Sequence, residues 1–180
     1  LQSGFALALG MSWKSGVAAE LIGQYMPQNV EKRYYRRHAN ILAAYVGILP
    51  PGPCRALLNR ISDAEALGEV QPYFMHFWLD AVQRCGMCGQ YTLSLLHQWV
   101  MPLCMNPKGL PEGFCKPEPT YRFDHSHAWG GTPAYALPQA LTGLEILEPG
   151  CRRIRLTPSL MGLARADVEV PTVLGMLRVH

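Results

Sequence analysis

The chain has 180 residues, of which 49% are hydrophobic and 16% are charged, and its mean hydropathy is +0.02. This composition supplies enough apolar material for a globular core and excludes a disordered tail. No apolar run is long enough to cross a bilayer, and the formal charge of +3 is too small to indicate a nucleic-acid partner. One cluster of basic and aromatic residues, 32–37, could bind a nucleic-acid strand, but we interpret it as a solvated lead-in to the helix that follows.

Apolar residues recur at helical spacing up to about residue 143. The first clear helix carries Ile41, Leu42 and Tyr45 on one face and ends before the proline-rich segment 50–53, and a short helix around Leu58 follows. A second stripe runs over residues 74–85 and predicts a helix buried on more than one side. Leu96, Trp99 and Leu103 continue the pattern in the next helix. Alternating helices with brief connections predict stacked helical hairpins.

The segment 106–124 contains four prolines and two glycines and predicts a long ordered loop. Thr132 and Pro133 then begin a helix whose expected buried stripe is Leu137, Ala140, Leu141 and Leu144. After the turn at 148–150 the apolar residues alternate with polar ones, which is typical of strands. The sequence therefore predicts a mainly α chain that ends in the first strands of an antiparallel β-domain.

The chain begins at Leu1, and its last residue, His180, follows an unfinished alternation of apolar and polar residues. We therefore expect a piece of a longer protein, in which any signal peptide would precede Leu1. Six cysteines lack the spacing of a small disulfide scaffold and are expected to be free thiols, which favours a reducing, cytoplasmic location. Cys85 and Cys88 have the spacing of a redox or zinc pair, but no second pair follows them.

The richest chemistry lies between Glu112 and Pro133, where acid, imidazole, indole and glycine share one short stretch. Glu112, between a proline and a glycine, is a candidate general base, and an ordinary surface glutamate is the alternative. Indole stacks on the apolar face of a sugar ring while imidazole bonds its hydroxyls, so the mixture suits carbohydrate. The candidate sugar-binding residues are His125, His127, Trp129, Trp78, Tyr121 and Phe74, although Trp78 and Phe74 also fit the core.

Two further hypotheses come from different classes of protein. In an extended segment His125 and His127 would point to one side and Ser126 to the other. With Asp124 they could hold a metal ion in a hydrolase, but the sequence offers no further ligand pattern, so we expect no metal and no cofactor. Alternatively, the same aromatic residues could belong to a non-catalytic carbohydrate-binding or scaffold module. Carbohydrate is the expected partner in both the enzymatic and the binding hypothesis, and the sequence leaves the oligomeric state open.

Several motifs, in order, resemble the C-terminal part of the bacterial α-L-rhamnosidase family, glycoside hydrolase family 78. The matching stretches are 110–114, 123–133, 141–144, 148–150, 156–158 and 170–172. The resemblance covers about the last seventy residues. It implies that residues 1–144 belong to a six-hairpin α/α toroid and residues 145–180 begin a C-terminal β-sandwich.

The resemblance also implies an inverting mechanism, in which a general acid protonates the leaving oxygen and a general base activates water. Glu112 and Phe114 match the family's base motif, and His127 matches its sugar-contacting histidine. Leu110 and Pro111 depart from the family's usual residues before the base, which makes Glu118 the substitute candidate. The family's acid lies in an upstream motif that this chain does not contain, so we expect the chain alone to hydrolyse nothing.

Overall fold

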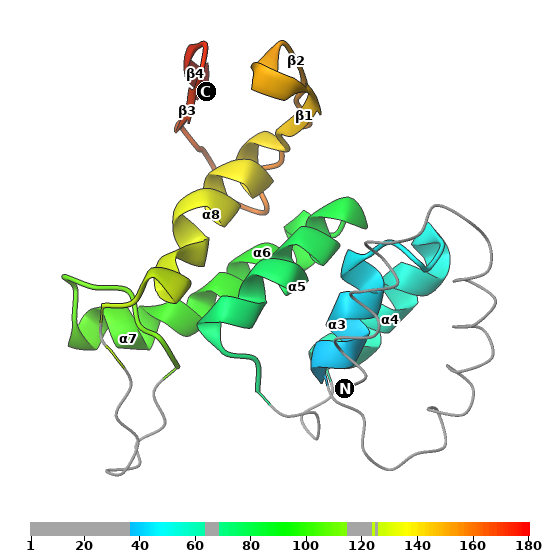
Figure 1. The fold of residues 1–180 in the computed structure, drawn as a ribbon, viewed down its shortest axis with the longest axis vertical. Coiled ribbons are helices and arrows are strands. Elements are labelled where there is room, and N and C mark those ends of the chain that lie inside the picture. Colours follow the sequence, from blue (N-terminus) through cyan, green and yellow to red (C-terminus); the bar gives the residue numbers. More distant parts are fainter. Residues whose placement is uncertain (1–36, 64–68, 115–123, 125) are drawn as a thin grey trace. The chain divides into compact units, whose positions relative to one another are not determined.

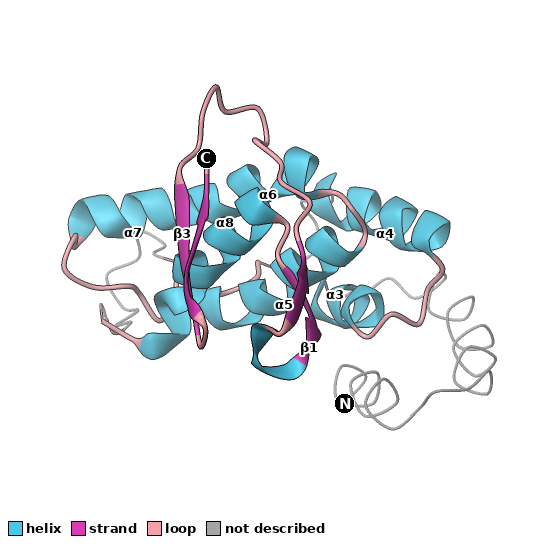
Figure 2. Cartoon of the chain, turned by 90° about the horizontal axis from the view of Figure 1, so that it is seen from above, coloured by secondary structure: helices cyan, strands magenta, loops and turns pink. Residues whose placement is uncertain are grey.

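A computed structural model describes residues 37–63, 69–114, 124 and 126–180 (Figures 1 and 2). It divides the chain into two compact units, residues 1–70 and residues 71–180. Across the described ranges, helices dominate up to Thr142 and strands begin at Glu145. A membrane-spanning helix would have to be longer and more apolar than any helix in those ranges. The predicted change from helix to strand near residue 143 is confirmed.

The described part of the first unit is a helical pair, α3 (Arg37–Tyr45) and α4 (Pro51–Asp63), which pack against each other (Figure 1). Arg37 Nε donates to the Ile61 carbonyl at 3.0 Å and ties the start of α3 to the end of α4. Helix α3 ends at Tyr45, before the proline-rich segment 50–53, as predicted. Pro51 and Pro53 lie in the first turn of α4, where a missing backbone N–H costs nothing because that group has no intrahelical partner.

Helices also form the core of the second unit, and α5 (Pro72–Arg84) packs against both α6 (Cys88–Leu96) and α8 (Thr132–Thr142). The predicted apolar character of α5 is confirmed by six buried residues on it: Pro72, Met75, Trp78, Leu79, Ala81 and Val82. A single 3-10 turn, η1 (His97–Trp99), joins α6 to α7 (Val100–Met105). A second 3-10 turn, η2 (Ala128–Gly131), runs directly into α8.

The buried face of α8 differs in part from the predicted stripe. Ala140 is buried as predicted and Ala136 is buried with it, whereas Leu137 and Leu141 are only half-buried. Small residues allow α8 to approach α5 and α6 closely, so the leucines did not mark the most buried side of the helix. The helix ends at Gly143, whose φ of 58° is left-handed. Gly143 also lies close to Thr157, and a Cβ at this position would overlap the threonine carbonyl.

Two separate antiparallel hairpins follow α8 (Figure 2). Strand β1 (Glu145–Glu148) pairs with β2 (Arg153–Arg155), and β3 (Val168–Thr172) pairs with β4 (Gly175–Val179). The antiparallel pairing predicted from the alternation is confirmed. The toroid and the β-sandwich that the family resemblance implies stay predictions.

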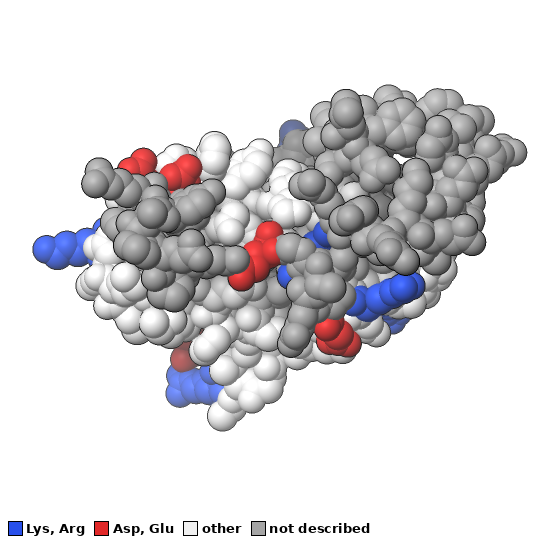
Figure 3. All heavy atoms as spheres, turned by 90° about the horizontal axis from the view of Figure 1, so that it is seen from below, with Lys and Arg blue, Asp and Glu red and all other residues white. Residues whose placement is uncertain are grey.

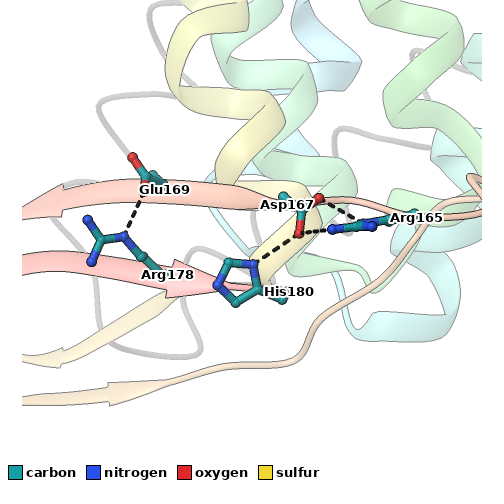
Figure 4. Close-up of polar contacts among 5 residues, drawn as sticks. All are labelled: Arg165, Asp167, Glu169, Arg178 and His180. Carbon is teal, nitrogen blue, oxygen red and sulfur yellow. Dashed lines mark hydrogen bonds and ion pairs between the residues drawn. The ribbon is translucent and has the colours of Figure 1, made fainter.

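The terminal hairpin has one apolar and one charged face. Val168 lies opposite Val179 and is 7% exposed, on the strand that packs against α8. On the charged face Arg178 bonds Glu169 across the strands at 2.7 Å (Figure 4). Hydrogen bonds from Arg165 and His180 lower the pKa of the Asp167 carboxyl, so this carboxylate stays ionised to lower pH than usual (Figure 4). Alternation of charged and apolar residues thus fixes which face turns inward.

The cysteines differ from the expectation of six free thiols. Cys54 and Cys85 are each disulfide-bonded, whereas Cys88, Cys104 and Cys151 are free. The CxxC spacing therefore does not mark a Cys85–Cys88 bond. Burial raises the pKa of the Cys88 thiol, which keeps it protonated and poorly reactive. Because two cysteines are oxidised, cysteine usage no longer favours a reducing compartment, and the cytoplasmic location stays a prediction.

Candidate functional site

The candidate site is built from two loop segments that pair through their backbones. Glu112 N donates to the Asp124 carbonyl at 2.8 Å, and His127 N donates to the Leu110 carbonyl at 2.7 Å. On the first segment the bonded residues, 110 and 112, are two positions apart. On the second segment the bonded residues, 124 and 127, are three positions apart. The second segment therefore carries one extra residue, as in a β-bulge, which redirects the side chains that follow it.

A buried tryptophan anchors both segments. Trp99 is 1% exposed, and its Nε1 donates to the Gly130 carbonyl in η2 at 3.0 Å. Its ring also meets the edge of Phe114 with 4.7 Å between centroids. Phe114 N in turn donates to the side chain of Gln71, at the start of α5, at 2.9 Å. One indole thus ties the Glu112 segment and the His127 segment to the helical core.

Gly130 is required by the close approach of these two segments. A Cβ at this position would overlap the Pro111 carbonyl oxygen and would lie 2.8 Å and 2.9 Å from the carbonyl carbon and the Cβ of Leu110. Most of these atoms belong to the backbone and cannot rotate away. The glycine-rich character of the loop therefore has a packing reason at Gly130, whereas a Cβ added at Gly131 would have no atom within 4 Å.

The His127 ring is oriented by its own turn. Its Nδ1 accepts a hydrogen bond from Trp129 N at 3.1 Å, and its ring lies 4.7 Å from the Trp129 ring in an edge-to-face arrangement. An imidazole that accepts at Nδ1 carries its proton on Nε2 when neutral. The geometry therefore leaves Nε2–H as a hydrogen-bond donor for a ligand.

The Glu112 side chain is half-buried and contacts the backbone of the paired segment. Its Oε2 accepts a long hydrogen bond from Asp124 N, with 3.4 Å between the atoms. Its neighbours Pro111 and Gly113 are buried and fix the backbone around it. Glu112 and His127 are thus carried by adjacent, mutually bonded segments.

An open depression of about 460 Å³ adjoins the His127 segment, and this volume is in the range of small-molecule sites. Its lining residues come from the end of α7, the following loop and the start of η2: Leu103, Pro107, Lys108, Gly109, Leu110, Ser126, His127 and Ala128. Glu112 is not one of them. Ser126 lines the same depression as His127.

A second crevice lies among α5, α6 and α8, next to the hydrogen bond between His76 Nδ1 and the Tyr135 hydroxyl. It measures about 20 Å³, which is room for about one water molecule. Although Asp80 and Gln83 are among its lining residues, it is too small for a sugar ring. The depression beside His127 is therefore the better candidate of the two.

The predicted sugar-binding residues do not all lie at the site. His127 and Trp129 lie at the site, and Trp129 is 50% exposed. Trp78 is 3% exposed in the core of the second unit, so its prediction as a sugar contact is corrected, because the apolar stripe of α5 turns it inward. The remaining aromatic candidate on α5, Phe74, is half-buried and contacts Phe77.

Three predicted residues, Tyr121, His125 and the substitute base Glu118, lie outside the described residues. Within the described ranges, no group of three histidine, cysteine or acidic side chains could hold a metal ion. Since His125 belongs to the metal hypothesis, that hypothesis stays untested.

Sequence reasoning missed Tyr73, in the first turn of α5. It is 52% exposed, and its ring centroid lies 4.9 Å from that of Trp129. The helical pattern indicated only that position 73 lies off the buried stripe. Its proximity to Trp129 depends on a tertiary contact between residues more than fifty positions apart.

Charged side chains are interspersed on the face of the described residues that Figure 3 shows, without a basic stripe there. Comparisons with protein-family models, with curated proteins and with solved structures give no match for this chain.

Proposed function

We propose that this chain is part of an inverting glycoside hydrolase of the α-L-rhamnosidase type and binds a terminal rhamnosyl unit beside His127. The observation that carries the proposal is the arrangement of His127 between a sugar-sized depression and the exposed ring of Trp129. Its Nε2–H can donate to a sugar hydroxyl, and the adjacent indole offers an apolar face for the ring carbons. The motif resemblance supplies the choice of rhamnose.

In this proposal Glu112 is the general base that removes a proton from the attacking water. The two carboxyl groups of an inverting pair stand about 6.5 to 9.5 Å apart so that water fits between sugar and base. Glu112 does not line the depression, so its role as base is supported by the motif resemblance and by its place on the segment that pairs with the His127 segment. The partner acid would be supplied from outside this chain.

A non-catalytic carbohydrate-binding module is the second candidate. It is favoured by the same observation, that Glu112 does not line the depression, together with the long hydrogen bond that occupies Glu112 Oε2. In that case the loop would hold a sugar without acting on it. The two candidates agree on sugar binding by His127 and differ in the role of Glu112.

The proposal predicts that the 180-residue chain binds L-rhamnose, measurable by saturation-transfer NMR and by titration calorimetry, without cleaving an aryl α-L-rhamnoside. His127→Ala should weaken binding about tenfold or more, because it removes a hydrogen bond and one wall of the depression. His180→Ala, a matched change of an exposed histidine in the terminal hairpin, should leave binding unchanged. Equal affinity of the two variants would exclude His127 from the site, and cleavage by the chain alone would overturn the placement of the acid.

A further inference from the structure

Three sulfur-bearing side chains lie within about one turn of α7, which lies at one edge of the second unit (Figure 1). Met101 and Met105 are 67% and 63% exposed, and Cys104 is an exposed free thiol. The helix turns a different face inward, since Pro102 is buried and Leu103 lines the depression. Two thioethers and a thiol are therefore presented to solvent together. We call Met101, Cys104 and Met105 the sulfur cluster.

Helical spacing makes the three side chains of the sulfur cluster neighbours. Residues three and four positions apart in a helix lie on the same face, with about 5 to 6 Å between their Cβ atoms. Cys104 and Met105 stand in these two relations to Met101. A methionine side chain has three rotatable bonds, so its Sδ atom can cross such a gap without a change in the backbone. An ion held above Met101 is therefore within reach of all three sulfur atoms.

The donor atoms of the sulfur cluster are those that soft metal ions prefer. Thiolate and thioether sulfur suit Cu(I), whereas protein sites for zinc combine thiolate with imidazole or carboxylate. Two of the three donors are thioethers, so the cluster lies outside the groups of histidine, cysteine and acidic side chains considered above for a metal ion. A site with one thiolate and two thioethers thus favours Cu(I) over the harder divalent ions.

From this arrangement we propose that the sulfur cluster binds one Cu(I) ion through Met101 Sδ, Cys104 Sγ and Met105 Sδ. The Cys104 thiol loses its proton to solvent as the Cu–Sγ bond forms, and the two thioether bonds form without loss of a proton. Copper stays Cu(I) throughout, so the step needs no oxidant or reductant. The three residues are not among those that line the depression, so this site is independent of the proposed sugar site.

The test is a competition between the chain and bicinchoninate for Cu(I), under argon and without added thiol, followed by the absorbance of the bicinchoninate complex. We expect one tightly bound ion per chain. Cys104→Ser should weaken binding about a hundredfold or more, since it removes the anionic donor of the cluster. Met101→Leu and Met105→Leu should each weaken binding about tenfold, because leucine keeps the apolar volume without the sulfur.

Two matched controls lie outside the sulfur cluster. Cys151→Ser changes another free thiol, in η3 (Pro149–Cys151), and Met176→Leu changes a methionine that is 48% exposed in β4. Both variants should keep the full affinity for Cu(I). X-ray absorption at the copper edge should show sulfur ligands only, with one fewer in each methionine variant of the cluster. Far-UV circular dichroism shows whether each variant is folded.

Three results would overturn the inference. Unchanged affinity in Cys104→Ser, or a large loss in Cys151→Ser, would place the ion elsewhere. Full affinity in both methionine variants of the cluster would show that the thiol binds copper without the thioethers. A copper-dependent dimer in sedimentation velocity would show that thiolates of two copies share the ion. L-Rhamnose binding does not enter any of these readouts, so this inference and the proposed function fail separately.

Discussion

Replacing Trp99 with alanine is expected to lower the free energy of unfolding of the second unit by about 3 to 5 kcal/mol. The substitution removes a large side chain that is 1% exposed, and its cavity would open between η1, Phe114 and η2. It also removes the donor to the Gly130 carbonyl. Urea unfolding followed by far-UV circular dichroism measures the change through the shift in midpoint.

Two further variants test whether the loss of stability depends on the Trp99 hydrogen bond and on the buried position of this tryptophan. Trp99→Phe keeps much of the apolar volume and loses the hydrogen bond, so we expect a smaller loss of about 1 to 3 kcal/mol. Trp129→Ala removes a tryptophan that is 50% exposed and should cost about 1 kcal/mol, clearly less than Trp99→Ala. A Trp99→Ala variant as stable as Trp129→Ala would show that Trp99 does not anchor the loop.

Replacing Gly130 with alanine is expected to destabilise the second unit by about 1 to 3 kcal/mol and to abolish L-rhamnose binding. The new Cβ would overlap the Pro111 carbonyl and crowd Leu110, and this backbone can yield only if the two loop segments separate. Separation would break the bond between His127 N and the Leu110 carbonyl. Stability is measured by urea unfolding and binding by titration calorimetry.

The neighbouring glycine provides a matched control for this substitution. A Cβ at Gly131 meets no atom within 4 Å, and its φ of −72° is open to any residue. Gly131→Ala should therefore retain both stability and sugar binding. Equal behaviour of the two alanine variants would mean that the close approach at Gly130 does not hold the site together.

Helical periodicity predicted the elements whose burial depends on local sequence. The stripe along α5 and the buried position of Trp99 both follow from apolar spacing, because each helix has one face against the core. The alternation of valines in the terminal hairpin likewise predicted its pairing. These features need no information from distant parts of the chain.

Features that depend on tertiary contacts were not predictable in the same way. The pairing of the His127 segment with Leu110 and Glu112 joins residues that no local pattern brings together. The contact of Tyr73 with Trp129 joins a helix to a loop far along the chain. The prolines that open α4 were not recognised as its first turn, because the same residue type ends one helix and begins another.

The proposal as a whole requires Glu112 and His127 to act on one sugar, and NMR titration with L-rhamnose tests this most directly. The Glu112 side-chain carboxyl carbon and the His127 ring protons would be followed together. We predict that both signals shift along a single saturation curve, while the carboxyl of Glu169, paired with Arg178 in the terminal hairpin, stays still. A shift at His127 without one at Glu112 would contradict the hydrolase and leave only the binding module, and no shift at either would contradict the sugar site itself.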